Sequence, residues 1–67
     1  MIPVNSSNLQ AVGYNSELKE LTIQFHSSGI YTYMEVPQHI YEGLMAAPSK
    51  GSYHHEHVKG YPYRKGF

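Results

Sequence analysis

The alternation of apolar and polar residues is clearest between positions 21 and 36, where it predicts a β-hairpin. Apolar side chains recur at every second position, at Leu21, Ile23 and Phe25, which is the period of a strand with one buried face. Ser28-Gly29 follows, and glycine tolerates the positive φ that tight hairpin turns require. The pattern therefore predicts two antiparallel strands joined by a two-residue loop.

That loop length determines which residues face one another across the predicted hairpin. It places His26 opposite Tyr31 and Gln24 opposite Tyr33. One face of the hairpin should then be apolar, and the other should carry the two tyrosines. The buried face would hold Leu21, Ile23, Phe25, Ile30, Thr32, Met34 and Val36. The opposite face would hold Thr22, Gln24, His26, Tyr31, Tyr33 and Glu35.

An earlier strand is predicted over residues 9–14, with the turn into the hairpin near residues 15–17. If Tyr14 pairs with Leu21 and Val12 pairs with Ile23, the side chains of Tyr14 and Val12 lie on the core face. The small residues Ala11 and Gly13 would then leave a shallow depression beside the two tyrosines. The segment around Pro3 is at best an edge strand, because proline cannot donate to a sheet ladder.

Two helices are predicted after the hairpin. The first runs from about Gln38 to Ala47, between two prolines, with an apolar stripe at helical spacing. The second runs from about Lys50 to Lys59, with Ser49 as N-cap. The tail, residues 61–67, is expected to lie extended against the body of the domain.

Together these elements predict an α+β fold: a three-stranded antiparallel β-meander, two short helices packed on one face, and an extended C-terminal tail. The 67 residues form one domain, which buries about 60% of the surface that its unfolded chain exposes. The predicted core is Val12, Leu21, Ile23, Phe25, Ile30, Met34, Val36, Ile40, Leu44 and Tyr53.

The composition of the chain excludes several classes of protein and of site. The absence of cysteine excludes a disulfide framework and a thiolate metal site. The N-terminus does not resemble a signal peptide, and no apolar run approaches the roughly 18 residues of a membrane span. We therefore expect a small soluble, cytoplasmic domain without a membrane partner.

Charge is unevenly distributed although the chain is formally neutral. Residues 1–48 hold one lysine against four glutamates, and residues 49–67 hold four cations against one glutamate. Such asymmetry marks either a basic tail that meets a polyanion or two halves that attract each other in the fold.

Tyr31 and Tyr33 are the first candidate binding residues. Two aromatic rings at positions i and i+2 of a strand can stack nucleic-acid bases without reading their sequence. Gln24 and His26, opposite them, would add hydrogen bonds. The alternative is packing, because cross-strand aromatic pairs stabilise sheets and the tail could cover this face.

Lys50, Lys59, Arg64 and Lys65 form the second candidate group, interleaved with tyrosines. Cations that contact phosphates beside aromatic rings are typical of nucleic-acid binding. The alternative is a solvated basic end of the domain. If Arg64 lies against the sheet, it becomes a structural partner for a glutamate instead.

Catalytic and metal sites are not predicted. The chain has no aspartate, no cysteine and no nucleophile elbow, and no small-molecule substrate or cofactor is evident. His54 and His57 could share one helical face, but two ligands are too few for a stable zinc site.

Segments along nearly the whole chain occur in the order typical of one family. They are Val4–Ser7, Val12-Gly13-Tyr14, Leu21–Phe25, Gly29–Tyr33, Val36-Pro37, Tyr41 with Leu44, Ser49–Tyr53 and Tyr61–Arg64. In these segments the chain resembles the KTSC domain of bacteria and their phages, which also occurs at the C-terminus of some lysyl-tRNA synthetases. The resemblance implies no established activity, and it suggests RNA binding through that attachment.

We therefore expect a non-enzymatic binding module for RNA or another single-stranded nucleic acid. A protein-interaction module, either a homodimer or an accessory domain that docks on a larger protein, is the alternative. In that case the depression beside Ala11 and Gly13 would accept a partner side chain, and an edge strand could extend a sheet.

Overall fold

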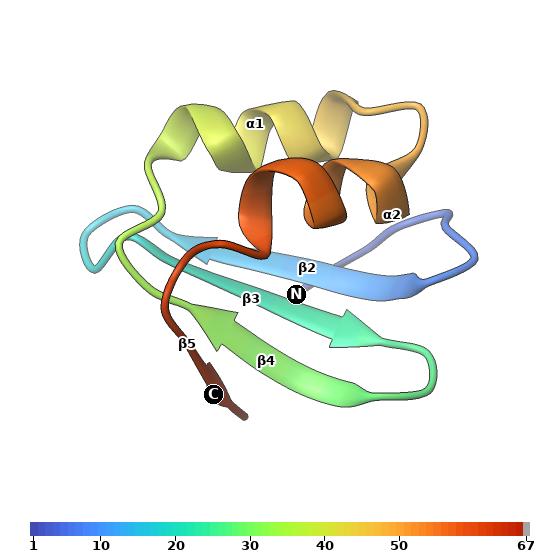
Figure 1. Ribbon diagram of the computed structural model, residues 1–67, viewed down its shortest axis with the longest axis horizontal. Coiled ribbons are helices and arrows are strands. Elements are labelled where there is room, and N and C mark those ends of the chain that lie inside the picture. The colour runs from blue at the N-terminus through green and yellow to red at the C-terminus, as the bar shows by residue number, and fades with distance from the viewer. Residues whose placement is uncertain (67) are drawn as a thin grey trace.

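Two helical segments lie on one face of a five-stranded antiparallel sheet, and the other face carries no helix (Figure 1). This computed structural model describes residues 1–66, so the tail's predicted course at Phe67 lies outside the described residues. The sheet order follows the chain order. The strands are β1 (Ile2–Pro3), β2 (Leu9–Asn15), β3 (Glu20–Phe25), β4 (Gly29–Tyr33) and β5 (Tyr63–Lys65).

The α+β class and the antiparallel meander are confirmed, but the prediction of three strands is wrong. The segment around Pro3 forms the short edge strand β1, which pairs with β2. The tail forms the other edge strand, β5, which pairs with β4. Two backbone bonds extend that pairing, from the Met34 amide to Pro62 and from the Gly66 amide to Ile30, each 2.7 Å long. Three-residue strands such as β5 carry too little local pattern to be predicted.

The pairing of β2 with β3 agrees with the prediction at its centre, where Val12 lies opposite Ile23 and Tyr14 opposite Leu21. An irregularity at Gln10 shifts the register before that point. Because an extra residue reverses the alternation of faces, Leu9 is fully buried.

The predicted register of β3 with β4 is wrong. The loop has three residues, 26–28, and Gly29 with φ +88° begins β4 opposite Phe25. Ile23 therefore faces Tyr31 and not Met34. The observed partner, Tyr31, lies three residues before the predicted one, Met34. Because three is an odd number, every β4 side chain lies on the face opposite to the predicted one. Tyr31 points toward the helices, and Ile30 lies on the open face.

Helix α1 (Gln38–Ala46) begins after Pro37, as predicted. Helix α2 (Lys50–Tyr53) begins at Ser49, whose Oγ accepts a hydrogen bond from the Ser52 amide. It continues as a π-helical segment, η1 (His54–Val58), which ends close to the predicted boundary. None of the helices in the described part of the chain is long and apolar enough to cross a membrane.

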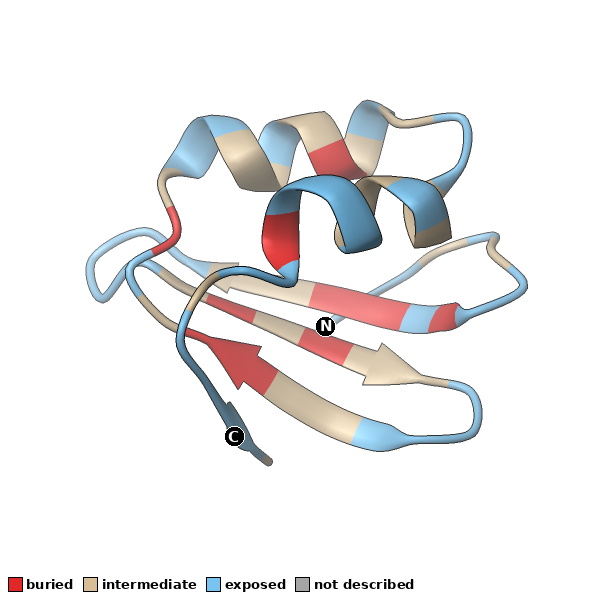
Figure 2. Ribbon diagram, in the orientation of Figure 1, coloured by how far each residue is buried: buried red, intermediate tan, exposed pale blue. Residues whose placement is uncertain are grey.

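The core lies between the helices and the sheet, where the buried residues of Figure 2 gather. Five predicted core residues are fully buried: Val12, Leu21, Ile23, Val36 and Leu44. Phe25, Ile40 and Tyr53 pack against them and are half-buried. The prediction is wrong for Ile30 and Met34, which are not part of the core cluster. Leu9, Tyr33 and Val58 take part in it instead.

Candidate nucleic-acid interface

The sheet separates the residues that the sequence placed together. Tyr31 and Tyr33 lie on the helix-covered side, since they pair with Ile23 and Leu21. Gln24 lies on the open face beside Ala11 and Ile30, so its predicted place opposite Tyr33 is wrong. The exposed His26 lies in the β3–β4 loop, with Nε2 3.1 Å from the Ser6 carbonyl oxygen, and its predicted pairing with Tyr31 is wrong.

Tyr33 is a core residue, because only 5% of its surface is exposed. Its hydroxyl lies 2.8 Å from Nε2 of His54, which gives the buried hydroxyl the hydrogen-bond partner it needs. Burial raises the pKa of Tyr33, and the neighbouring Tyr63 and Tyr31 raise it further. Tyr33 therefore does not present an open stacking surface, and the packing alternative holds for this residue.

An aromatic cleft of about 230 Å³ remains above Tyr33, lined by Phe25, Ser28, Tyr31, Tyr33 and His54. Its rings meet edge to face: Phe25 and Tyr31 at a centroid distance of 5.9 Å, and Phe25 and His54 at 5.1 Å. Tyr63, whose surface is 58% exposed, packs edge-on against Tyr31 at 5.7 Å. The cleft thus has rigid aromatic walls and an opening to solvent.

His54 forms one wall of this cleft as a neutral ring. Burial lowers the pKa of His54, and the nearby Lys59 and His55 lower it further. The sequence grouped His54 with exposed helix histidines, and it gave no sign that the π-helical segment turns this side chain toward Tyr33. Among residues 1–66, no three histidine or glutamate side chains converge on a possible metal position.

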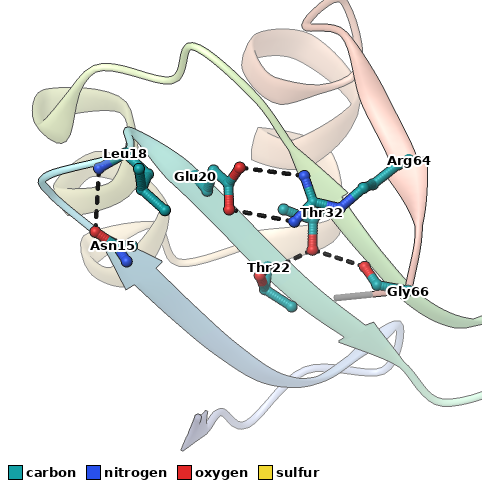
Figure 3. Close-up of polar contacts among 7 residues, drawn as sticks. All are labelled: Asn15, Leu18, Glu20, Thr22, Thr32, Arg64 and Gly66. Atoms are coloured by element: carbon teal, nitrogen blue, oxygen red, sulfur yellow. Dashed lines mark hydrogen bonds and ion pairs between the residues drawn. The ribbon is translucent and has the colours of Figure 1, made fainter.

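Two of the four candidate cations are used inside the domain. Nζ of Lys50 donates hydrogen bonds to the carbonyl oxygens of Met45 and Ala47, at 3.1 and 3.0 Å. Arg64 donates two hydrogen bonds to the carboxylate of Glu20 on the open face, at 3.1 and 3.2 Å (Figure 3). Arg64 therefore takes the structural role that the sequence left open.

Lys59 and Lys65 are exposed, and neither forms an ion pair with any residue that the structure describes. Lys65 lies directly opposite Tyr31 in the β4–β5 ladder. Lys59 follows η1 and is near enough to His54 to affect its pKa. Each of these two cations is therefore close to one residue of the aromatic cleft, Lys65 to Tyr31 and Lys59 to His54.

The open face carries a polar network of its own. Thr32 donates to the Gly66 carbonyl oxygen at 2.7 Å and lies 3.0 Å from the Thr22 hydroxyl (Figure 3). A hollow of about 360 Å³ lies beside this network and is lined in part by Gly13, Glu20 and Arg64. It includes Gly13 of the predicted depression but not Ala11, which is buried, and Tyr31 and Tyr33 lie on the other side of the sheet.

A polar pocket of about 310 Å³ was not predicted. It is lined by residues 5–8 and 48–52, which the sequence analysis interpreted as a turn and as the start of a helix. Both segments are rich in small polar residues, mainly serine and asparagine, and this shared composition is the signal that could have predicted a common pocket. The sequence alone does not bring two segments so far apart together.

The comparisons with known proteins agree with this fold. Residues 5–63 match the model of the KTSC domain. The crystal structure of a KTSC domain protein from Yersinia pestis superposes with a TM-score of 0.94 at 36% identity, covering 97% of this chain and 93% of that one.

Two curated relatives extend the comparison. The lysine–tRNA ligase of Nostoc sp. is 38% identical over 60 residues, which are 90% of this chain but only 11% of the ligase. An uncharacterised protein of Stutzerimonas stutzeri is 32% identical over 63 residues, covering 94% of this chain and 89% of that protein. From the family match and the shared fold, the chain belongs to the KTSC domain family, whose function is not established.

Proposed function

We propose that this domain is a non-enzymatic binding module for single-stranded nucleic acid. One base stacks in the aromatic cleft, and Lys59 and Lys65 contact the adjacent phosphates. The observation that carries the proposal is a solvent-open cleft with aromatic walls, one of which, Tyr31, lies opposite Lys65 in the ladder, while another, His54, lies close to Lys59.

The cleft has the chemistry of a stacking site. Tyr31 and Phe25 offer ring surfaces, and base–aromatic stacking contributes about 1–3 kcal/mol per base. The hydrogen bond between Tyr33 and His54 holds two of the lining side chains in place before a ligand binds. A rigid site loses little conformational entropy when its ligand arrives.

The charges predict modest affinity. The chain is formally neutral, and only two cations border the cleft, so few counterions are released on binding. Two phosphate contacts on a single strand correspond to a slope of about −1.4 in log K against log salt concentration. Affinity should then fall about sevenfold between 50 and 200 mM salt.

The relatives give independent support of a limited kind. The related segment of the Nostoc protein is part of a lysine–tRNA ligase, an enzyme that is named for a tRNA. A small module that holds single-stranded RNA would be useful beside such an enzyme. That enzyme's own activity is not proposed for this chain.

The test is fluorescence anisotropy with a labelled eight-residue oligouridylate at 50 and 200 mM KCl. The variant Tyr31→Leu removes the ring but keeps apolar volume, and the Lys59→Gln/Lys65→Gln double variant removes both charges. Tyr61→Leu and Lys19→Gln are the controls, because Tyr61 does not line the cleft and Lys19 lies in the β2–β3 turn, at the opposite end of β3 from Phe25 and Ser28. Each variant is checked for folding by circular dichroism.

We expect Tyr31→Leu to weaken binding at least fivefold at both salt concentrations, while the double lysine variant also loses the salt dependence. Both controls should bind like the wild type. An anisotropy that stays flat up to about 100 µM protein, the weak end of non-specific affinity, would refute the proposal.

A protein-interaction module is the second candidate, and the uncovered sheet face favours it. The hollow beside Gly13 has the Glu20–Arg64 pair on its wall and could accept a partner side chain. Sedimentation equilibrium tests the homodimer version. A dimer that dissociates in the variant Gly13→Gln would support it, and a monomer at 100 µM would reject it.

A further inference from the structure

The polar pocket is formed by two segments that lie at least 40 positions apart in the sequence. Residues 5–8 supply two asparagines and two serines, and residues 48–52 supply two more serines and Lys50. Figure 1 shows these two connections and the β3–β4 loop gathered at the same end of the molecule. The pocket is therefore a feature of the tertiary fold and not of one loop.

Several polar groups in this pocket have unused hydrogen-bonding capacity. Ser6 and Ser49 are occupied, since Ser6 accepts from two backbone amides and Ser49 caps α2. Within residues 1–66, the hydroxyl of Ser7 and the side-chain amide of Asn8 have no hydrogen-bond partner. The Ser52 hydroxyl accepts from Ser49 but keeps its own proton free to donate.

The pocket and the aromatic cleft adjoin the same third hollow, which has a volume of about 170 Å³. It shares Ser7, Asn8 and Gly51 with the polar pocket. It shares Phe25, Ser28 and His54 with the aromatic cleft. The three hollows thus form one trough, aromatic at one end and rich in hydroxyl and amide groups at the other.

The polar end of the trough has little charge. Its one cation is the Lys50 ammonium, and two of the three N–H groups on that ammonium already donate to backbone carbonyls. Neutral groups that both donate and accept are suited to hydroxyl groups, which do the same. The polar end is therefore better suited to bind a sugar than to bind phosphate groups.

We propose that the polar pocket holds the ribose of the nucleotide that follows or precedes the one whose base stacks in the aromatic cleft, and that its serine hydroxyls contact the 2′-hydroxyl of that ribose. The domain then binds RNA in preference to DNA, because the 2′-hydroxyl is the group that distinguishes the two at a given position. This inference rests on the proposed function, since it needs a base in the cleft.

The test compares two labelled oligonucleotides, octauridylate and octadeoxyuridylate, which have identical bases and differ only in the 2′-hydroxyl. The protein variant is Ser7→Ala/Ser52→Ala, two exposed residues whose hydroxyls do not support the core. Ser16→Ala, in the β2–β3 turn at the opposite end of the sheet, is the matched control. All affinities are measured by anisotropy at 50 mM KCl.

The wild type should bind the RNA about fivefold more tightly than the DNA, which corresponds to one net hydrogen bond. The double serine variant should bring that ratio close to one by weakening only the RNA complex, and Ser16→Ala should preserve it. Tyr31→Leu should weaken both complexes and leave their ratio unchanged.

Two results would overturn the inference while leaving the proposed function in place. One is equal binding of RNA and DNA by the wild type, and the other is an unchanged preference in the double serine variant. Failure of both oligonucleotides to bind would refute the proposed function itself, and this inference with it.

Discussion

The hydroxyl of Tyr33, at the end of β4, lies 2.8 Å from Nε2 of His54, at the start of the π-helical segment. The two rings are also in edge-to-face contact, with centroids 5.4 Å apart. This contact joins the sheet to the helical layer 21 residues later in the chain. It joins a candidate binding residue and a histidine that was predicted to be exposed into one structural unit, and both side chains line the aromatic cleft.

Acidification should destabilise the domain through His54. Its pKa is lowered in the folded state, chiefly by burial, from an ordinary value of 6.5. Between that lowered pKa and 6.5 the unfolded chain binds more protons than the folded one, so stability falls as the pH falls. The slope for one group is at most about 1.4 kcal/mol per pH unit, and partial exposure makes it smaller.

Urea unfolding between pH 7.5 and 5 measures this effect. The variant His54→Gln keeps a hydrogen-bonding group toward Tyr33 but cannot titrate, so its stability should change less with pH over this range. His39→Gln, at an exposed position of α1, is the matched control and should keep the wild-type dependence. Equal pH profiles for the wild type and His54→Gln would show that His54 is not the group responsible.

Lys50 should contribute to stability through the C-terminal end of α1. Its ammonium group donates to the carbonyl oxygens of Met45 and Ala47, where helix carbonyls lack intrahelical partners. Lys50→Met keeps the length of the side chain and removes both bonds, and we expect a loss of about 1–2 kcal/mol in unfolding free energy. Lys59→Met, at an exposed position, should stay within about 0.5 kcal/mol of the wild type. A loss of similar size in both variants would contradict this capping role.

The Glu20 carboxyl should titrate at lower pH than an ordinary glutamate. The hydrogen bond from Arg64 is the main cause of its lowered pKa, and the charge of Arg64 adds to it. In Arg64→Gln the carboxyl pKa should rise toward 4.5, as followed by carbon NMR of the side chain. Lys65→Gln removes the same charge from the next position of β5 and should leave the titration nearly unchanged. The prediction fails if both variants move the Glu20 titration equally.

Gly43 should resist the usual stabilising replacement by alanine. In the middle of α1, helix propensity alone favours alanine by about 1 kcal/mol. A Cβ at this position would lie 2.7 Å from Cζ of Tyr53, so the tyrosine must move. We expect Gly43→Ala to lower the melting temperature, with a cost of about 1–3 kcal/mol.

The control for that experiment is Gly60→Ala, because a Cβ there meets nothing within 4 Å. Adding Tyr53→Phe to Gly43→Ala removes the hydroxyl nearest the new methyl group and should recover part of the loss. Thermal unfolding followed by circular dichroism compares all three variants. A melting temperature for Gly43→Ala at or above the wild-type value would show that Tyr53 gives way freely.

Local periodicity was sufficient for much of the fold. Val12, Leu21 and Ile23 are fully buried as predicted, because alternation within one strand depends only on neighbouring residues. The same holds for Leu44 on the apolar stripe of α1, which begins after Pro37 as predicted. For the candidate site, the sequence named Tyr31, Lys59 and Lys65 as candidates, and the structure places Lys65 opposite Tyr31 and Lys59 near His54. The place of His54 in the lining of the cleft was not predicted.

The sequence by itself determined the antiparallel meander, the position of the helices and most of the buried face of β3. Tertiary structure decided the register at Gly29, because a glycine with positive φ can stand within a hairpin loop or at its end, and the apolar residues of β4 fit either face. It also decided the pairing of β5, the burial of Tyr33 and the joining of residues 5–8 with residues 48–52. These features depend on hydrogen bonds and packing between distant segments, and a one-residue change of register reverses which side chains a strand buries.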